Sequence, residues 1–385
     1  MQLSFLKAIF FLNFCFLFTN INLLYDFYSS QYLAGAIILS FFIFITKIKN
    51  IKINRSFLIF VLLTGLSLVF NEIPEILNSN IKWLLWIIVA VFMGPLIFSQ
   101  NLVKFRIEII NLFLNFCIFI SVLSFLWYVF NLPNLGRGTF TGITKHSMIL
   151  APLCSIAFIK LLVDIQHKRN KYLLRIALML IALITVLLSA SRTSILAILL
   201  IITLSFFIFS TKKYQNYIKI LFIASTLLVI HNSYNFFEIN ILSAVAEKGV
   251  LNSRDNLWSI RAAEFYDSPI LGIGFLNSHD PRVLFDYFNF EPGSSFMLIL
   301  SNLGIIGFLS FLYFMSAVML KDTNVKNYSR YKLTLFYIII FFLVSFISEG
   351  YIFSISSGIS LIFWLTLGSF QDLSFKVKQN YGNKA

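Results

Sequence analysis

The chain of 385 residues is far more apolar than a soluble domain: hydrophobic residues make up 59%, charged residues 12%, and the mean hydropathy is +0.86. A net charge of +14 would suggest nucleic acid as the partner of a soluble protein, but here the Lys and Arg residues follow a topological pattern. The composition therefore excludes a soluble catalytic domain and predicts an all-α, polytopic membrane protein without a nucleic-acid partner.

Apolar stretches of about 15 to 24 residues recur along the chain, near the length that a helix needs to cross the hydrocarbon of a bilayer. The first stretch is expected to stay as a helix, because three Asn residues interrupt it and no small-residue cleavage site for a signal peptidase follows. Twelve membrane helices are predicted, over 4–24, 31–47, 57–70, 83–99, 108–130, 147–163, 172–189, 193–210, 217–231, 296–319, 333–348 and 352–370.

These spans divide the chain into four regions. Helices one to nine occupy 1–231, a large polar loop occupies 232–295, helices ten to twelve occupy 296–370, and a tail covers 371–385. With a cytoplasmic N-terminus, nineteen Lys and Arg residues fall on the inner side and eight on the outer side, and every short inner loop is basic, including Gln100 to Arg106. This bias predicts that both termini are cytoplasmic and that the large loop lies outside.

Neither a cofactor nor a metal is expected. The three cysteines lie within apolar spans, and there is no Cys and His cluster with the spacing of metal ligands. Nucleotide-binding glycine motifs are absent from the sequence as well. The energy for any reaction must then come from the substrate or from a gradient.

The large polar loop concentrates the chemistry of the chain, with eight of the sixteen acidic residues. A helix outside the hydrocarbon is predicted from Asn252 to Tyr266, with Ser253 or Asp255 as its cap, and it should end before Pro269. Arg254, Trp258 and Arg261 recur at spacings of four and three and so share one face of this helix. Gly272 and Gly274 then give a permissive backbone.

Arginines on the outer side are the sharpest signal, because the positive-inside bias gives them no topological reason to be there. Guanidinium matches phosphate oxygens, so Arg137, Arg192, Arg254 and Arg261 are candidate phosphate ligands. Arg192 follows a tight turn at the start of the eighth span, where the helix dipole also favours an anion. The alternative is that Arg192 reaches to lipid headgroups or pairs with Glu349.

Two histidines are candidates for a general base: His146 before the sixth span and His279 in the large loop. The alternatives are a helix-end role for His146 and a solvated loop side chain for His279. Trp258 and Phe275 are candidates for stacking on sugar rings, or for lying in the membrane interface. The loop acids are further candidates to activate a hydroxyl, or else are solvated or paired with arginines: Asp255, Glu264, Asp267, Asp280, Asp286 and Glu291.

Three stretches resemble the O-antigen polymerase and O-antigen ligase superfamily of bacterial inner-membrane glycan proteins. The stretch from Arg137 to His146 resembles the family's Arg-x-x-Gly segment before a membrane helix, and Ser189 to Ser194 is similar to its short Ser-Arg turn. Arg254 to Gly274, continued by Ser294 to Gly307, is similar to its large periplasmic loop and the return to the membrane. Together these stretches cover about residues 137 to 307, and the helix layout extends the match.

The resemblance implies glycosyl transfer at the periplasmic face of the inner membrane. The donor would be an oligosaccharide on undecaprenyl diphosphate, the arginines would hold its diphosphate, and membrane lipids, a chain-length regulator and a flippase are candidate partners. Family ligases typically carry a histidine just before the re-entering helix, where this chain has Gly293. The sequence therefore favours a polymerase, with His279 ranked before His146 as the base. Ligation to the lipid A core, a lipid-linked oligosaccharide flippase and a non-catalytic scaffold are the alternatives.

Overall fold

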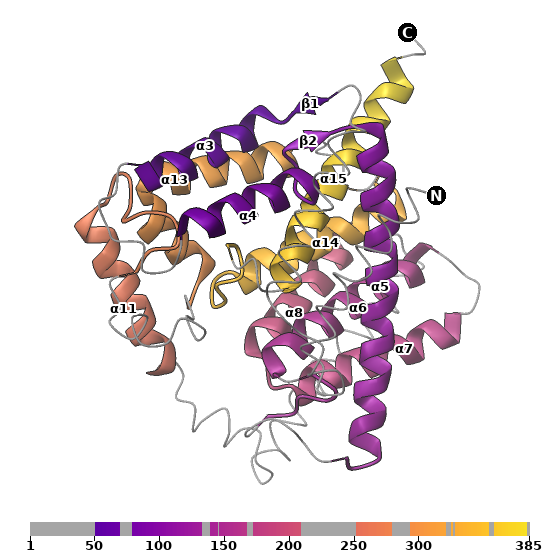
Figure 1. Ribbon diagram of the computed structural model, residues 1–385. Coiled ribbons are helices and arrows are strands. Elements are labelled where there is room, and N and C mark those ends of the chain that lie inside the picture. Colours follow the sequence, from indigo (N-terminus) through magenta and orange to yellow (C-terminus); the bar gives the residue numbers. More distant parts are fainter. Residues whose placement is uncertain are drawn as a thin grey trace.

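The structure is a computed structural model, which describes residues 51–69, 79–132, 139–144, 146–167, 172–208, 252–278, 293–320, 325, 328–353 and 358–382 (Figure 1). For 79, 252–256 and 375–382 it describes the backbone alone. The predicted spans over 4–24, 31–47 and 217–231 lie outside the described residues.

The described part of the chain contains ten α-helices and a pair of two-residue strands. Three helices, α5, α6 and α13, are long and apolar enough to cross a membrane, and α3, α4, α7 and α8 are shorter apolar helices. The all-α class is therefore confirmed. The elements are β1 Lys52–Ile53, α3 Arg55–Val69, α4 Ser79–Phe92, β2 Ile97–Phe98, α5 Gln100–Val129, α6 Ser147–His167, α7 Tyr172–Leu188, α8 Arg192–Ile208, α11 Asn252–Asp267, α13 Ser295–Met319, α14 Arg330–Ser345 and α15 Gly358–Gly382.

The region between the fourth and fifth predicted spans differs from the prediction. Helix α4 ends at Phe92 rather than near 99, because Pro95 lacks the N–H that a helix needs, and the chain then forms β2, which pairs antiparallel with β1. Helix α5 already begins at Gln100, where the Ser99 hydroxyl accepts a hydrogen bond from the Leu102 N–H at 3.3 Å. The loop expected over Gln100 to Arg106 is therefore helical.

Hydrogen bonds and ion pairs between helix termini define two ends of the molecule. We call the end that holds β1 and β2 the strand end; hydrogen bonds and ion pairs there join the starts of α3, α5 and α14 to the ends of α6 and α15. The opposite end, where α6, α8 and α13 begin and α14 ends, is the loop end. Arg192 and His146 lie at the loop end, whereas Lys104, Arg106 and Arg330 lie at the strand end.

An aromatic core holds α3, α4, α13 and α15 together. The ring centroids of Phe57 and Phe314 lie 4.5 Å apart, and those of Trp86 and Trp364 lie 5.6 Å apart. Phe275, which follows α11, joins the same core 4.8 Å from Phe353 and is fully buried. Phe275 is therefore a packing residue in this structure, and neither sugar stacking nor an interfacial position describes it.

Candidate functional site

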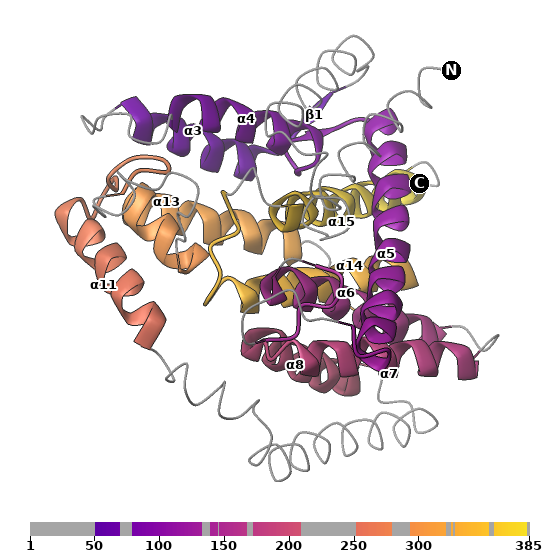
Figure 2. The same ribbon diagram turned by 60° about the horizontal axis from the view of Figure 1, so that its bottom comes forward.

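The predicted helix of the large loop is present as α11, which packs against α13 on the side away from α5 (Figures 1 and 2). It ends at Asp267, two residues before Pro269, as expected. Its start at Asn252 places the predicted caps, Ser253 and Asp255, inside the first turn. The face that carries Trp258 and Arg261 is thus held beside the returning helix.

The segment that follows α11 occupies a break in α13. Gly304 interrupts that helix with a φ of 62°, and the Ile273 N–H donates to the Ser301 carbonyl at 2.8 Å while the Ile305 N–H donates to the Pro269 carbonyl at 2.9 Å. A Cβ on Gly304 would lie 2.3 Å from the Ile270 carbonyl oxygen. Glycine is therefore required where the loop crosses the helix.

The same crossing requires the first glycine of the loop. Gly272 has a φ of 73°, and a Cβ there would lie 2.2 Å from the carbonyl carbon of Asn302. Gly274, with a φ of 108°, donates its N–H to the Asn302 carbonyl at 3.1 Å. The permissive backbone read from Gly272 and Gly274 thus lets the loop approach the helix backbone closely.

A buried ion pair fastens α11 to the end of this segment. Arg261 is 2% exposed, and its Nη1 donates to Glu264 Oε2 at 2.6 Å and to the Asn277 carbonyl at 3.4 Å. The other oxygen of Glu264 accepts a hydrogen bond from the Ser278 hydroxyl at 2.7 Å. Because both oxygens of this carboxylate have partners, Glu264 is built into the structure rather than presented to an acceptor hydroxyl.

Two amides complete the junction between the loop and α13. Asn302 Nδ2 donates to the Asn277 carbonyl at 2.9 Å, and Asn277 Nδ2 donates to the Ile273 carbonyl at 3.2 Å. The Oδ1 atoms of both residues are buried and have no hydrogen-bond partner within the described residues. From α3, the Ser67 hydroxyl donates to the Asn302 carbonyl at 2.9 Å, so three segments meet at this point.

The start of α13 is fixed to the turn between α14 and α15. The Ser294 hydroxyl caps α13 by accepting from the Met297 N–H at 3.4 Å, and it donates to the Phe346 carbonyl at 3.0 Å. The Ser295 hydroxyl donates to the Glu349 carbonyl at 2.7 Å. Ser294 and Ser295 thus position the re-entering helix.

Gly293, at the position where family ligases typically carry histidine, has a left-handed φ of 74°. A Cβ there would lie 3.0 Å from Leu257 Cβ and 3.5 Å from Trp258 Cδ1. The backbone and its surroundings therefore both favour glycine at this position. Trp258 packs beside this glycine, and its Nε1 is buried without a hydrogen-bond partner in the described part of the chain.

His146 lies just before α6 and is exposed. Its Nδ1 accepts a hydrogen bond from the Met148 N–H at 3.3 Å, which is the arrangement of a helix cap. The Tyr351 hydroxyl donates to the Met148 carbonyl at 3.2 Å, so the start of α6 lies next to the α14–α15 turn that also holds α13. His146 therefore lies near the re-entering helix, and because Nδ1 accepts this hydrogen bond, Nε2 carries the proton of the neutral ring.

Arg192 is the first residue of α8, after a tight turn in which Ala190 has a φ of 52°. The Ser191 hydroxyl donates to the Ser194 hydroxyl at 3.0 Å inside the first turn of the helix. The side chain of Arg192 is half-buried at the loop end. The turn read from the sequence is therefore present, and it places a cation at a helix N-terminus.

The structure brings only some of the predicted site residues together. Arg261 and Trp258 lie at the junction of α11 and α13, whereas His146 and Arg192 lie at the starts of α6 and α8. Arg137 and His279 lie outside the described residues, and Arg254 is described only as part of the α11 backbone. Their roles stay predictions.

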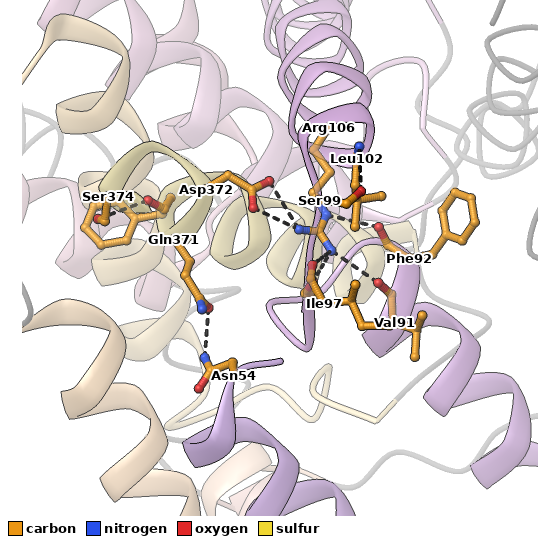
Figure 3. Close-up of polar contacts among 12 residues, drawn as sticks. Asn54, Val91, Phe92, Ile97, Ser99, Leu102, Arg106, Gln371, Asp372 and Ser374 are labelled. Carbon is orange, nitrogen blue, oxygen red and sulfur yellow. Dashed lines mark hydrogen bonds and ion pairs between the residues drawn. The ribbon is translucent and has the colours of Figure 1, made fainter. Parts of the chain in front are cut away.

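The strand end holds a polar cluster that the sequence analysis did not single out (Figure 3). Arg106 is fully buried, and its Nη1 donates to both oxygens of Asp372 at 3.1 Å. Its Nε donates to the Phe92 carbonyl at 3.0 Å, and its Nη2 donates to the Val91 and Gly94 carbonyls. In the sequence, Arg106 stands beside Lys104 in a short basic stretch, and Asp372 is the one acid of the last helix, but nothing in the sequence indicates that Arg106 and Asp372 pair.

In a comparison with protein families, the model of the family described as O-antigen ligase matches residues 177–312. The match begins inside α7, includes the Arg192 turn and α11, and ends inside α13. No curated protein sequence matches the chain. The resemblance to the O-antigen polymerase and ligase superfamily is therefore confirmed, and it falls on the segments that build the junction described above. Proteins of this family are membrane enzymes of the glycosyltransferase type.

Proposed function

We propose that this protein polymerises lipid-linked oligosaccharide repeat units in the biosynthesis of O-antigen or another surface polysaccharide. The observation that carries the proposal is the family match over the segments from Arg192 to the break in α13. The reducing-end sugar of the donor leaves its diphosphate and is joined to a hydroxyl at the non-reducing end of a second lipid-linked unit. Undecaprenyl diphosphate is the leaving group, so neither nucleotide nor metal is needed to drive the transfer.

Positive charge at the loop end would hold the diphosphate and stabilise it as negative charge develops on departure. Arg192 is best placed for this role because the start of α8 adds its helix dipole. We propose Arg254 and Arg137 as its partners. To bind the diphosphate, the guanidinium of Arg261 would have to break its ion pair with Glu264, and the carboxylate would then be buried without its partner. We therefore assign Arg261 a positioning role instead.

The acceptor hydroxyl needs a base, and we propose His279 first and His146 second. Ser278, which directly precedes His279, is fixed by Glu264 and lies in the segment that crosses the break in α13. Trp258, on the face of α11 beside Gly293, is the proposed platform for a sugar ring. The periplasmic location of the large loop and cytoplasmic termini are part of the same proposal.

Polymerisation is preferred to ligation because of Gly293. The left-handed backbone and the closeness of Leu257 and Trp258 disfavour the histidine that family ligases typically place there. A ligase that transfers finished glycan to lipid A core is the second candidate, supported by the description of the matched family.

The test is a gel of surface polysaccharide from cells whose own copy is replaced by Arg192→Ala or Arg254→Ala. Loss of polymerisation leaves a single repeat unit on the core, whereas loss of ligation leaves no attached glycan and loss of a flippase strands lipid-linked units inside the cell. Lys104→Ala, an exposed cation at the strand end, is the matched control. A full ladder from both arginine variants at normal protein levels would remove these residues from the mechanism.

A further inference from the structure

An open pocket of about 500 Å³ lies at the strand end, far from the proposed reaction. The start of α3, the last turns of α13 and Gln371 of α15 form its walls. Its volume falls within the range of about 300–1,000 Å³ that is usual for ligand sites.

The polar side chains that line this pocket are neutral except for one cation, Arg55, and none of its lining residues is acidic. Arg55 is exposed and forms no hydrogen bond or ion pair with the described residues. Two other arginines at the strand end differ, since Arg106 pairs with Asp372 and Arg330 with Asp164, both at 3.1 Å. The pocket therefore presents a cation whose charge is not balanced by a neighbouring acid of the described structure.

Further donors and an apolar rim surround this cation. Gln371, which lines the pocket, accepts a hydrogen bond from Asn54 Nδ2 through Oε1 at 2.9 Å, and its Nε2 is a donor (Figure 3). The phenol of Tyr313 is a further donor, on a side chain that is 58% exposed. Beside them, Ile53 and Leu320 are 55% and 66% exposed.

We propose that this pocket binds the phosphate headgroup of an anionic phospholipid, from the leaflet that meets the strand end. A phospholipid places a phosphate directly beside acyl chains, and the pocket places Arg55 directly beside the apolar rim of Ile53 and Leu320. Basic pockets between membrane helices bind anionic headgroups in this way. The lipid would join α3, α13 and α15, and so would stabilise the strand end independently of the glycan chemistry.

The test uses the purified full chain in detergent with an equimolar mixture of phosphatidylglycerol and phosphatidylcholine, with the retained lipids counted by native mass spectrometry. Wild type should retain phosphatidylglycerol preferentially, and Arg55→Ala should lower that preference about fivefold, as expected for one cation at an anionic lipid. Arg55→Lys should keep most of the preference, and so should the matched control Lys104→Ala.

Three outcomes would overturn the proposal. Equal retention by wild type and Arg55→Ala, with unchanged melting temperature, would show that the pocket does not select the headgroup. Equal loss in Lys104→Ala would show a general charge effect. Displacement of the lipid by millimolar inorganic phosphate would show that the pocket binds free phosphate rather than a lipid.

Discussion

Two buried arginine–carboxylate pairs lie at different places in this molecule, and they stabilise different kinds of structure. At the strand end, Arg106 combines its ion pair to Asp372 with hydrogen bonds to backbone carbonyls at the end of α4. At the junction of α11 and α13, Arg261 pairs with Glu264 three residues along the same helix. The first pair closes a helix end, whereas the second fixes a loop.

The difference follows from what surrounds each guanidinium. Helix α4 ends before Pro95 and leaves carbonyl groups without helical partners inside the protein, and Arg106 satisfies them. Around Arg261 the partners are the Asn277 carbonyl and, through Glu264, the Ser278 hydroxyl, both in the segment that crosses α13. Only the second pair lies in the region that matches the O-antigen ligase family. Burial is therefore common to both ion pairs, whereas a position within the matched family region is not.

The largest expected effect is at the strand end. Arg106→Ala leaves Asp372 and several carbonyls buried without partners, so we expect unfolding to become easier by about 3–5 kcal/mol. Thermal unfolding of the purified protein measures this change. Lys104→Ala, two residues earlier on the same helix and exposed, should unfold like wild type. If Arg106→Ala has the same melting temperature as wild type, the hydrogen bonds of Arg106 do not stabilise the end of α4.

The next largest effect is expected at the α11–α13 junction, where variants of Arg261 and Glu264 distinguish a structural role of the ion pair from a role in the reaction. Glu264→Ala leaves Arg261 charged and buried, at a cost of about 3 kcal/mol, whereas Arg261→Met combined with Glu264→Leu should recover most of that stability. Because Arg261 is assigned to positioning, the double variant should still make polymer, with chains shortened by a less well fixed loop. Stable protein that makes no polymer at all would instead return Arg261 to the diphosphate site.

The sequence revealed the helical class, the tight turn before Arg192 and the helix around Trp258, because hydrophobic length, turn residues and helical spacing are local signals. It did not reveal that Arg106 and Arg261 are buried. Asp372, the partner of Arg106, lies far along the chain, and the Asn277 carbonyl that accepts from Arg261 lies in a loop without periodicity, although Glu264 is only three residues from Arg261. The early start of α5 was missed for the same reason. A short basic stretch looks like a loop until the buried acid at Asp372 is known.

A smaller effect is expected where the loop crosses α13. Gly304→Ala would force a Cβ to within 2.3 Å of the Ile270 carbonyl oxygen at a φ of 62°, and we expect a loss of about 1–3 kcal/mol and reduced polymer length. Melting temperature and the polysaccharide ladder are the two measurements. Ser316→Ala, on the same helix beyond the break, is the matched control. Equal behaviour of the two variants would mean that the crossing adapts without cost.

The smallest effect is expected at His146. Removing its hydrogen bond to the Met148 N–H by His146→Ala should cost about 0.5–1.5 kcal/mol. Since His279 is the preferred base, His146→Ala should shorten the polysaccharide less than His279→Ala does. Chain-length distributions from cells with matched protein levels measure this order. The reverse order would make His146 the base.

The central claim is that cations at the loop end hold the diphosphate of a lipid-linked donor during glycosyl transfer. Its most direct measurement is the reaction of purified protein with synthetic undecaprenyl-diphosphate-linked repeat units, following both polymer length and released undecaprenyl diphosphate. Wild type should release one undecaprenyl diphosphate for each unit added, and Arg192→Ala should lower the rate at least about a hundredfold, in line with the loss of one transition-state donor. Folded wild-type protein that forms no polymer, or an Arg192→Ala variant that works at the wild-type rate, would contradict the account.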